Sequence, residues 1–244
     1  MSFSENEKRL VSATKNFFTE QEKTKAVLGL SGGIDSAVVL GLLVKALGTE
    51  NVTAILMPNT LITKETNTQD AENLSKKLGV KYFIIPINSQ LDSFKNLPWE
   101  QSKIAKANLN ARVRALILYN FANSFSALVA GTGNKSEFYL GYFTKYGDAA
   151  ADFFPIGSLL KKEVRKLAKE LELPKGFLEK PPSAELWENQ EDEKELGFSY
   201  EEIDELLPLI LGNKEIPAKK KELVKKIKSI IKETEHKRSQ PKIL

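Results

Sequence analysis

The chain has 244 residues, of which 41% are apolar and 28% charged, and its 36 basic and 32 acidic side chains give a formal net charge of +4. These proportions are those of ordinary globular proteins, and so mild and interspersed a positive charge does not by itself indicate nucleic-acid binding. The sequence contains no cysteine, which excludes disulfides, thiolate metal sites and catalytic thiols.

The first two segments predict a helix and then a strand. Residues 4–22 carry apolar side chains at helical spacing, and residues 26–30 form a short, continuously apolar run of the kind buried on both faces of a parallel sheet. The first residues show no basic segment followed by an apolar run, and no stretch reaches the roughly 18 apolar residues of a membrane span. We therefore expect a cytoplasmic protein that makes no use of a membrane.

A Ser-Gly-Gly-Ile-Asp-Ser turn, residues 31–36, follows this strand, and a helix is predicted from Ser36 to about Leu47. Adjacent glycines let successive backbone N–H groups converge on an anion, and the helix N-terminus adds partial positive charge there. Asp35 would repel a bare phosphate but could hold a divalent cation that phosphates also bind, which indicates a magnesium nucleotide site. The spacing is neither that of a Walker loop nor that of a Rossmann glycine motif. A plain turn with Asp35 or Ser36 as N-cap would have the same residues.

Further strands and helices alternate along the chain. Strands are predicted at residues 52–57, 82–85 and 127–130, with a short fifth strand at Phe153-Phe154, and helices at 66–78, 102–123 and 159–171. This alternation predicts an α/β fold with a doubly wound parallel sheet of about five strands and helices on both faces. Ligands bind beyond the carboxyl ends of such strands, so the loops 31–36 and 131–137 are expected to share one site.

Two loops after the fourth predicted strand carry polar side chains. Glu137 could complete a magnesium site with Asp35, or it could be a solvated residue of a surface turn. Residues 141–152 combine aromatic side chains, Lys145 and two carboxylates, a mixture that suits stacking on a flat ring and hydrogen bonding to a ribose or phosphate. A structural loop with its aromatic side chains in the core would have the same composition.

The last third of the chain changes character after Pro174. Residues 181–197 are rich in acidic side chains and predict a mobile loop, and residues 200–244 return to helical patterns. The lysines of residues 219–228 are expected on the exposed face of an amphipathic helix. No repeat or linker divides the chain, so we expect a single domain over residues 1–244, with its α/β core at about 22–172.

Taken together, these motifs resemble those of the ammonia-dependent NAD synthetases, a family of PP-loop ATP pyrophosphatases. The resemblance runs from about residue 25 to 240 and rests on the 31–36 turn, Arg112-x-Arg114, Gly131-Thr132 with Glu137, Phe143 to Asp148, Pro182-Ser183-Ala184, Glu195-Leu196-Gly197 and Glu235-His236-Lys237-Arg238. One departure is that Ala149 and Ala150 stand where the family commonly has glycines, which leaves less room for a ligand near Asp152.

The resemblance implies a two-step amidation. The nicotinate carboxylate of deamido-NAD attacks the α-phosphate of ATP, pyrophosphate leaves, and ammonia then displaces AMP to form NAD. It also implies Mg²⁺ as cofactor, ATP as co-substrate, and a homodimer with deamido-NAD near the subunit interface. The apolar residues of helix 102–123 could pair across a two-fold axis, although burial in the core would explain them equally well.

The resemblance also assigns residues to these ligands. ATP would contact Gly29, Leu30, Ser31, Gly32, Gly33, Ile34, Asp35, Ser36, Thr132, Lys161 and Ser183. Deamido-NAD would contact Arg112, Lys145, Asp152, His236 and Lys237, and the metal would be held by Asp35 and Glu137. Catalysis would rest on Asp35, Lys161 and Asp152, because transfer at phosphorus needs positioning and charge neutralisation and no side-chain nucleophile. Asp152 or an acidic residue of a loop would take a proton from ammonium.

Two alternatives stay open on the sequence. Another PP-loop adenylating enzyme, such as one that modifies tRNA, would need a basic RNA-binding groove, which the even charge distribution does not favour. A nucleotide-binding protein without turnover would bind ATP and magnesium but release no AMP. With no cysteine, the chain offers no thiol nucleophile for taking ammonia from glutamine.

Overall fold

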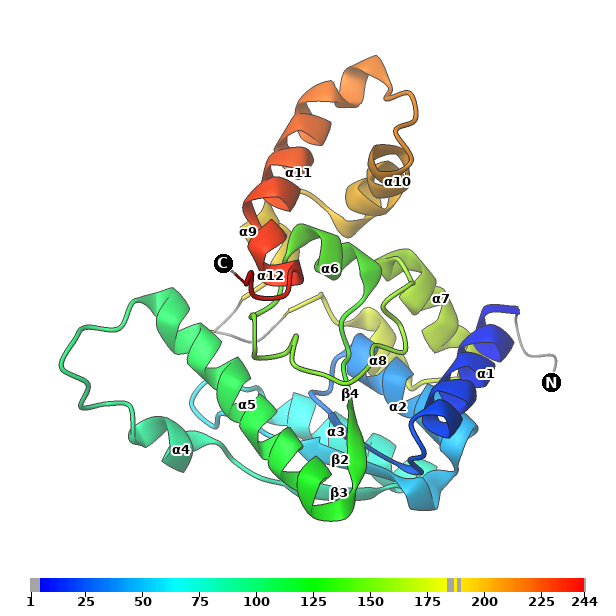
Figure 1. The fold of residues 1–244 in the computed structure, drawn as a ribbon, viewed down its shortest axis with the longest axis vertical. Coiled ribbons are helices and arrows are strands. Elements are labelled where there is room, and N and C mark those ends of the chain that lie inside the picture. Colours follow the sequence, from blue (N-terminus) through cyan, green and yellow to red (C-terminus); the bar gives the residue numbers. More distant parts are fainter. Residues whose placement is uncertain (1–4, 184–186, 188–189, 244) are drawn as a thin grey trace.

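A parallel β-sheet organises the computed structural model, which describes residues 5–183, 187 and 190–243 (Figure 1). Its strands are β1 (Lys25–Gly29), β2 (Val52–Leu56), β3 (Lys81–Ile84) and β4 (Ala127–Ala130), in the spatial order β3-β2-β1-β4. All pairings are parallel, and Leu28 of β1 lies opposite Ala54 on one side and Ala130 on the other. The predicted α/β fold class is confirmed.

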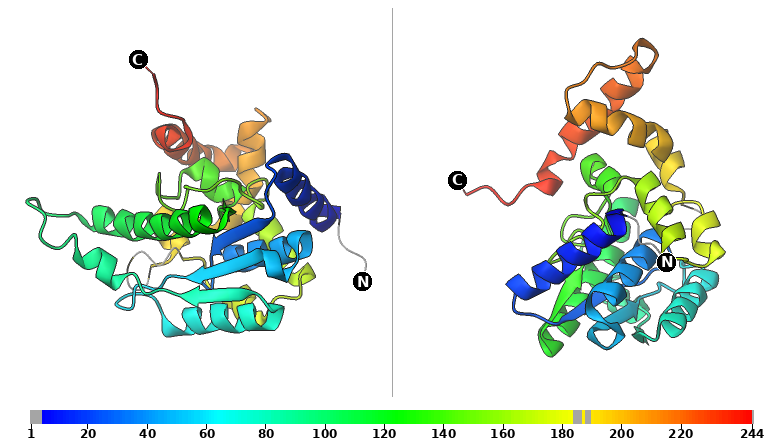
Figure 2. Two further views of the ribbon diagram at one scale, coloured as in Figure 1. Left: turned by 60° about the horizontal axis from the view of Figure 1, so that its bottom comes forward. Right: turned by 90° about the vertical axis from the view of Figure 1, so that its right-hand side faces the viewer.

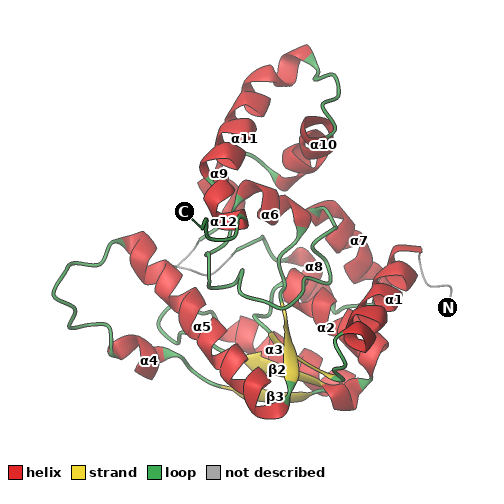
Figure 3. Cartoon of the chain, viewed as in Figure 1, coloured by secondary structure: helices red, strands yellow, loops and turns green. Residues whose placement is uncertain are grey.

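Helices cover both faces of this sheet (Figures 2 and 3). They are α1 (Glu5–Glu20), α2 (Ile34–Leu47), α3 (Glu65–Leu78), α4 (Asn88–Asp92), α5 (Lys103–Phe125), α6 (Lys135–Leu140), α7 (Lys161–Glu170), α8 (Lys175–Glu179), α9 (Asp192–Leu196), α10 (Tyr200–Leu211), α11 (Lys221–Glu233) and α12 (Glu235–Arg238). Short 3₁₀ turns occupy Thr49–Asn51 and Ala218–Lys220.

Alternate side chains of the strands enter two different cores. Leu28 packs in one apolar cluster with residues of α2, whereas its neighbour Val27 packs in another with Val113 of α5. This alternation follows from the two-residue period of a strand and explains why the central strands are apolar throughout.

The helices α10 and α11 form a hairpin that rises from the sheet region in Figure 1. A third apolar cluster, which includes Tyr200, Ile203 and Ile227, joins this hairpin to Leu140 of α6. The exposed lysines of α11 lie on its other side, as the amphipathic pattern predicts.

Two predicted segments differ from the structure. In the described part of the chain, the expected fifth strand is reduced to one bridge between Ala130 and Phe153, because Pro155 follows and the Phe153 ring packs against Phe17 and Phe18, with ring centroids 4.9 and 5.3 Å away. The segment 181–197, predicted as a loop, contains α9, while residues 184–186 and 188–189 lie outside the described residues. Among the described residues, no helix combines the length and apolar character needed to cross a bilayer.

Candidate active site

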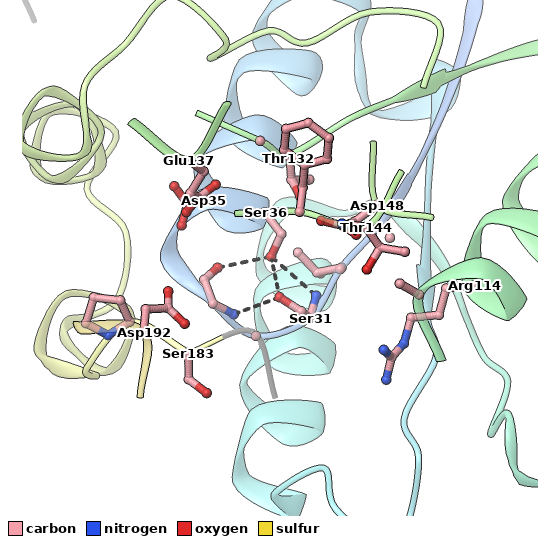
Figure 4. A pocket seen from close by; sticks show the side chains of 18 of the residues that line it. Ser31, Asp35, Ser36, Arg114, Thr132, Glu137, Thr144, Asp148, Ser183 and Asp192 are labelled. Atoms are coloured by element: carbon pink, nitrogen blue, oxygen red, sulfur yellow. Dashed lines mark hydrogen bonds between the residues drawn. The ribbon is translucent and has the colours of Figure 1, made fainter. Parts of the chain in front are cut away.

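The loop between β1 and α2 is held in shape by its own serines (Figure 4). The hydroxyl oxygens of Ser31 and Ser36 are 3.2 Å apart, the Gly33 N–H donates to Ser31 Oγ at 3.2 Å, and the Ser36 hydroxyl donates to the Gly33 carbonyl at 3.0 Å. Gly33 is the N-cap of α2 and no side chain caps the helix, so its first N–H groups are not capped by Asp35 or Ser36. The N–H groups of Ser31 and Gly33 thus donate within the loop, while the start of α2, which carries the partial positive charge of a helix N-terminus, has no side-chain cap.

Three charged side chains meet beside this loop. The Nζ atom of Lys161, a residue only 2% exposed, lies 2.5 Å from Oδ2 of Asp35 and 3.1 Å from Oε1 of Glu137. The side-chain amide of Asn134 donates to the other carboxylate oxygen of Asp35 at 2.9 Å. The helices α2, α6 and α7 therefore each supply one charge to a common centre.

Local capping fixes Glu137 at the start of α6. The Asn134 side chain accepts a hydrogen bond from the Glu137 N–H at 3.0 Å, and Glu137 Oε2 accepts one from the Asn134 N–H at 3.3 Å. Because this capping box uses one carboxylate oxygen, the other is left to face Lys161.

Asp204 of α10 holds α6 and α7 together behind this centre. Its carboxylate accepts from the Ser136 hydroxyl at 2.5 Å and from the Lys162 N–H at 2.6 Å. Ser136 and Lys162 are the immediate neighbours of Glu137 and Lys161, so this buried aspartate sets the distance between the two charged residues. Sequence reasoning missed Asp204 because its partners are distant in the chain.

The surroundings shift the pKa values of both Glu137 and Lys161. Burial raises the pKa of Glu137 to about 7, since the attraction of Lys161 only partly offsets burial and the Asp35 charge adds to it. Burial alone would lower the pKa of Lys161, but the two carboxylates outweigh it and the pKa lies above its ordinary value. Lys161 therefore stays charged at neutral pH, where Glu137 titrates.

This shift predicts a pH dependence of stability in the ligand-free protein. A carboxyl whose pKa is raised in the folded protein binds its proton more tightly there than in the unfolded chain. Its contribution to the free energy of unfolding is therefore complete below about pH 4.5 and is lost as the pH rises toward 7. We expect the free energy of unfolding, measured with denaturant between pH 5 and 8, to fall more steeply with pH in the wild type than in Glu137→Gln. Parallel curves for the two proteins would contradict the assignment.

A cavity of about 550 Å³ opens at the carboxyl ends of the strands, above this centre. Its lining includes every residue predicted to contact ATP, namely residues 29–36, Thr132, Lys161 and Ser183, together with Glu137 and Lys237. The structure thus brings the predicted ATP and metal residues into one site.

Three of the residues predicted to bind deamido-NAD form a neighbouring cluster outside the cavity lining. Arg112 donates to the Lys145 carbonyl at 3.4 Å, and Lys145 Nζ donates to the His236 carbonyl at 2.6 Å. Lys237 Nζ donates to the Phe143 carbonyl at 2.9 Å and does line the cavity. These contacts join α5, the loop 141–152 and α12 at one corner of the site.

Asp152 lies apart from these groups. Its Oδ2 accepts from the Val129 N–H of β4 at 2.7 Å and its Oδ1 accepts from the Tyr119 hydroxyl at 3.3 Å. Its carboxylate thus extends the backbone hydrogen bonding of β4. Asp152 is not among the residues that line the cavity with Asp35 and Lys161. Its roles in catalysis and in binding deamido-NAD stay predictions.

Several lining residues were not singled out from the sequence. Arg114, Thr144, Asp148 and Asp192 project into the cavity region in Figure 4. Arg114 Nε donates to the Met57 carbonyl at 3.0 Å. Arg114, Thr144 and Asp148 belong to the motifs that carry the family resemblance, so the motif itself was the available signal.

A parallel sheet whose first strand ends in a Ser-Gly-Gly-x-Asp-Ser turn, with Asp35 and Glu137 beside it, has the arrangement of a PP-loop nucleotide-binding protein. The family model for NAD synthase matches residues 7–241. The chain belongs to the NAD synthase family.

Comparison with individual proteins agrees with this assignment. The NH₃-dependent NAD⁺ synthetase of Archaeoglobus fulgidus is 45% identical over 243 residues, which cover 100% of this chain and 97% of that protein. The structure of the NH₃-dependent NAD synthetase of Campylobacter jejuni is 35% identical, with a TM-score of 0.84 and 100% of both chains covered. That of the NMN synthetase of Francisella tularensis is also 35% identical, with a TM-score of 0.88 over 100% of this chain and 99% of that one.

Proposed function

We propose that this chain catalyses the ATP-dependent amidation of deamido-NAD to NAD with ammonia, releasing AMP and pyrophosphate. The observation that carries the proposal is the position of Lys161 between Asp35 and Glu137, beside the anion-binding loop and within the cavity that all the predicted ATP residues line. An arrangement of this kind neutralises charge on phosphates and positions them, which is the main requirement of adenylation.

The first step needs no nucleophile from the protein. The bond from the nicotinate carboxylate oxygen to the α-phosphorus forms as the bond to the bridging oxygen breaks, and pyrophosphate leaves with the electron pair. The N–H groups of the 31–36 loop and the start of α2 would hold the leaving group. Lys161, kept charged by its two carboxylates, would offset the charge that develops on the phosphates.

We propose that Asp35 and Glu137 hold Mg²⁺ when ATP is bound. Magnesium takes one or two carboxylates and completes its shell with phosphate oxygens and water, and these two carboxylates already converge on a single cationic atom. No cluster of three or more His, Asp or Glu side chains suited to a metal occurs among the described residues, so the nucleotide itself would supply the remaining ligands. When bound, the metal would neutralise phosphate charge.

We place deamido-NAD at the corner formed by α5, the loop 141–152 and α12. Lys237 lines the cavity there, and Arg112, Lys145 and His236 adjoin it. This corner lies beside the predicted ATP residues, so a carboxylate bound there could approach the α-phosphate. In the second step, ammonia attacks the adenylated carbonyl carbon, its nitrogen gives up one proton to solvent or a nearby carboxylate, and AMP leaves with the electrons of the broken C–O bond.

The decisive experiment incubates the purified chain with ATP, Mg²⁺, ammonium and deamido-NAD and follows NAD, AMP and pyrophosphate together. Equal amounts of all three are expected, and Asp35→Ala should abolish them. AMP and pyrophosphate without NAD would indicate another acceptor. A parallel reaction with nicotinate mononucleotide in place of deamido-NAD tests the activity for which the Francisella tularensis relative is named. Production of ADP, or ATP binding without turnover, would contradict the proposal.

We further propose that residues 1–244 act as one domain in the cytoplasm. The cavity supports a single unit, because Asp192 of α9 and Lys237 near the end of the chain line it together with the 31–36 loop. Parts of the chain far apart in the sequence therefore contribute to one site.

We propose a homodimer formed through α5 and β3. Val113 of α5 is buried in the core, but Leu116 on the same helix is 70% exposed, and Phe83 of β3 and Phe125 are 38% and 48% exposed. Phe121 links the two phenylalanines, with ring centroids 6.1 Å from Phe83 and 4.5 Å from Phe125. Core packing thus accounts for only part of the apolar pattern of α5, and the patch that Phe83, Phe121 and Phe125 form at the end of this helix suits an interface.

This proposal predicts that Phe125→Glu converts the dimer into a monomer, because it places a charge in the apolar contact. Sedimentation at several protein concentrations measures the change in mass. Leu211→Glu serves as the control, since Leu211 is also an exposed apolar residue but lies on α10. A wild type that is monomeric at all concentrations, or a Phe125→Glu variant that remains dimeric, would contradict the interface.

A further inference from the structure

Lys180 stands against the anion-binding loop but is not one of the residues predicted to contact ATP. Its Nζ donates to the Gly32 carbonyl at 3.2 Å and lies 2.6 Å from a carboxylate oxygen of Asp70 on α3. The side chain is 27% exposed and lines the cavity. A cation is thus positioned directly at the glycine turn.

Arg165 adds a second cation to the same cavity. It lies one helical turn after Lys161 on α7, is partly exposed, and lines the cavity. Within the part of the chain that the structure describes, its guanidinium makes neither a hydrogen bond nor an ion pair. A guanidinium presents a fork of donors matched to phosphate oxygens, so Arg165 is available to an anionic ligand.

The negative charge of ATP and of the two carboxylates exceeds the positive charge that Lys161 supplies. Among the side chains predicted to contact ATP, Lys161 is the only cation, and Asp35 and Glu137 already share it. ATP carries about four negative charges, most of them on the part that leaves as pyrophosphate. Even with one magnesium ion, a site built only from these groups would hold excess negative charge, which further cations would relieve.

We propose that Lys180 and Arg165 bind the pyrophosphate part of ATP and stabilise it as the leaving group. The inference rests on the proposed function and extends it to two further residues. Lys180 exchanges Asp70 for a phosphate oxygen on binding. The exchange costs little, because both partners of this ion pair are partly exposed and such pairs contribute little to stability.

Asp70 makes the proposal testable, because two substitutions break the same ion pair with different effects on the cation. Lys180→Met removes the cation, whereas Asp70→Asn removes its competitor. If the ion pair has only a structural role, the two substitutions should change pyrophosphate affinity equally. If Lys180 binds phosphate, only Lys180→Met should weaken it. Lys180→Arg should retain binding, since it keeps the charge.

The experiment measures the binding of magnesium pyrophosphate, and separately of AMP, to each purified variant by isothermal titration calorimetry. We expect Lys180→Met and Arg165→Met each to weaken pyrophosphate binding about 10- to 100-fold and to leave AMP binding unchanged. Asp70→Asn should bind pyrophosphate at least as tightly as the wild type. Lys76→Met is the matched control, because it breaks an ion pair with Glu72 on the same helix α3 but does not line the cavity.

Three results would overturn the inference: equal weakening in Lys180→Met and Asp70→Asn, equal weakening of AMP and pyrophosphate, or no change in Lys180→Met and Arg165→Met. These measurements use neither deamido-NAD nor ammonia. Failure of the amidation assay with normal pyrophosphate binding would therefore count against the proposed function alone. Normal amidation, together with pyrophosphate binding that is unchanged in Lys180→Met and Arg165→Met, would count against this inference alone.

Discussion

Replacement of Lys161 by methionine is expected to lower kcat for amidation about 100- to 1,000-fold, the usual effect of removing one group that stabilises developing charge. Methionine keeps most of the side-chain length, so the variant removes chiefly the ammonium group that lies 2.5 Å from Asp35 and 3.1 Å from Glu137. Without it, the two carboxylates and the phosphates lose the protein cation that lies between them, and the charge that develops during transfer is less well offset. Steady-state assays at saturating ATP measure the loss.

The free energy of unfolding of Lys161→Met should also fall. Loss of one partner from a buried pair leaves an uncompensated charge, which typically costs about 3–5 kcal/mol. The cost should be smaller at pH 6, because Glu137 can then hold a proton. Lys166→Met is the control, since Lys166 lies on the same helix but is 76% exposed. If Lys161→Met keeps kcat within tenfold of the wild type, Lys161 serves only to hold the two carboxylates together.

The parts of the site that could be predicted from the sequence are those in which the chemistry lies within a few consecutive residues. The 31–36 loop is one example, because its glycines, serines and aspartate act through backbone geometry that neighbouring residues determine. The start of α6 is another. Its six residues are too few for an apolar period, but the Asn134-x-x-Glu137 spacing is that of a capping box, which marks the start of a helix.

Residues whose partners are distant in the chain could not be placed in this way. Asp204 contacts Ser136, 68 positions away, and Lys180 contacts Gly32, 148 positions away. Asp152 is a different case: the ligand contact that its motif indicates stays a prediction, whereas its hydrogen bond with a backbone N–H of β4 is one that no side-chain pattern reveals. Motifs identify which residues matter more reliably than they identify what those residues touch.

The strand β3 shows a further limit of apolar patterns. Its apolar sequence predicted a strand but not its place in the sheet: β3 is at the edge, and Phe83 and Ile84 are 38% and 43% exposed. An apolar run has the same composition whether a helix of the same chain or a second subunit covers it. The exposure of these residues beside α5 is therefore the structural reason for the proposed dimer interface.

Substitution of Gly32 by alanine is expected to weaken ATP binding and lower kcat/KM at least about 100-fold, since a misplacement of about 1 Å at a reacting centre has an effect of that size. Gly32 has a φ of +83°, and a Cβ there would lie 2.2 Å from the carbonyl oxygen of Asn67. The new methyl group would meet backbone atoms of α3, so the loop itself must move, and the N–H groups that we propose hold the phosphates would move with it.

The control for Gly32→Ala is Gly79→Ala, which separates conformational strain from the clash. Gly79 also has a positive φ, +67°, but nothing lies within 4 Å of a Cβ built there. This variant should lose about 1–2 kcal/mol of stability and keep its activity, because only the left-handed backbone is penalised. Calorimetric ATP binding and thermal unfolding compare the two proteins. If Gly32→Ala binds ATP as Gly79→Ala does, the glycine turn provides chain reversal alone, and phosphate binding must rest on Lys161 and the other cations of the cavity.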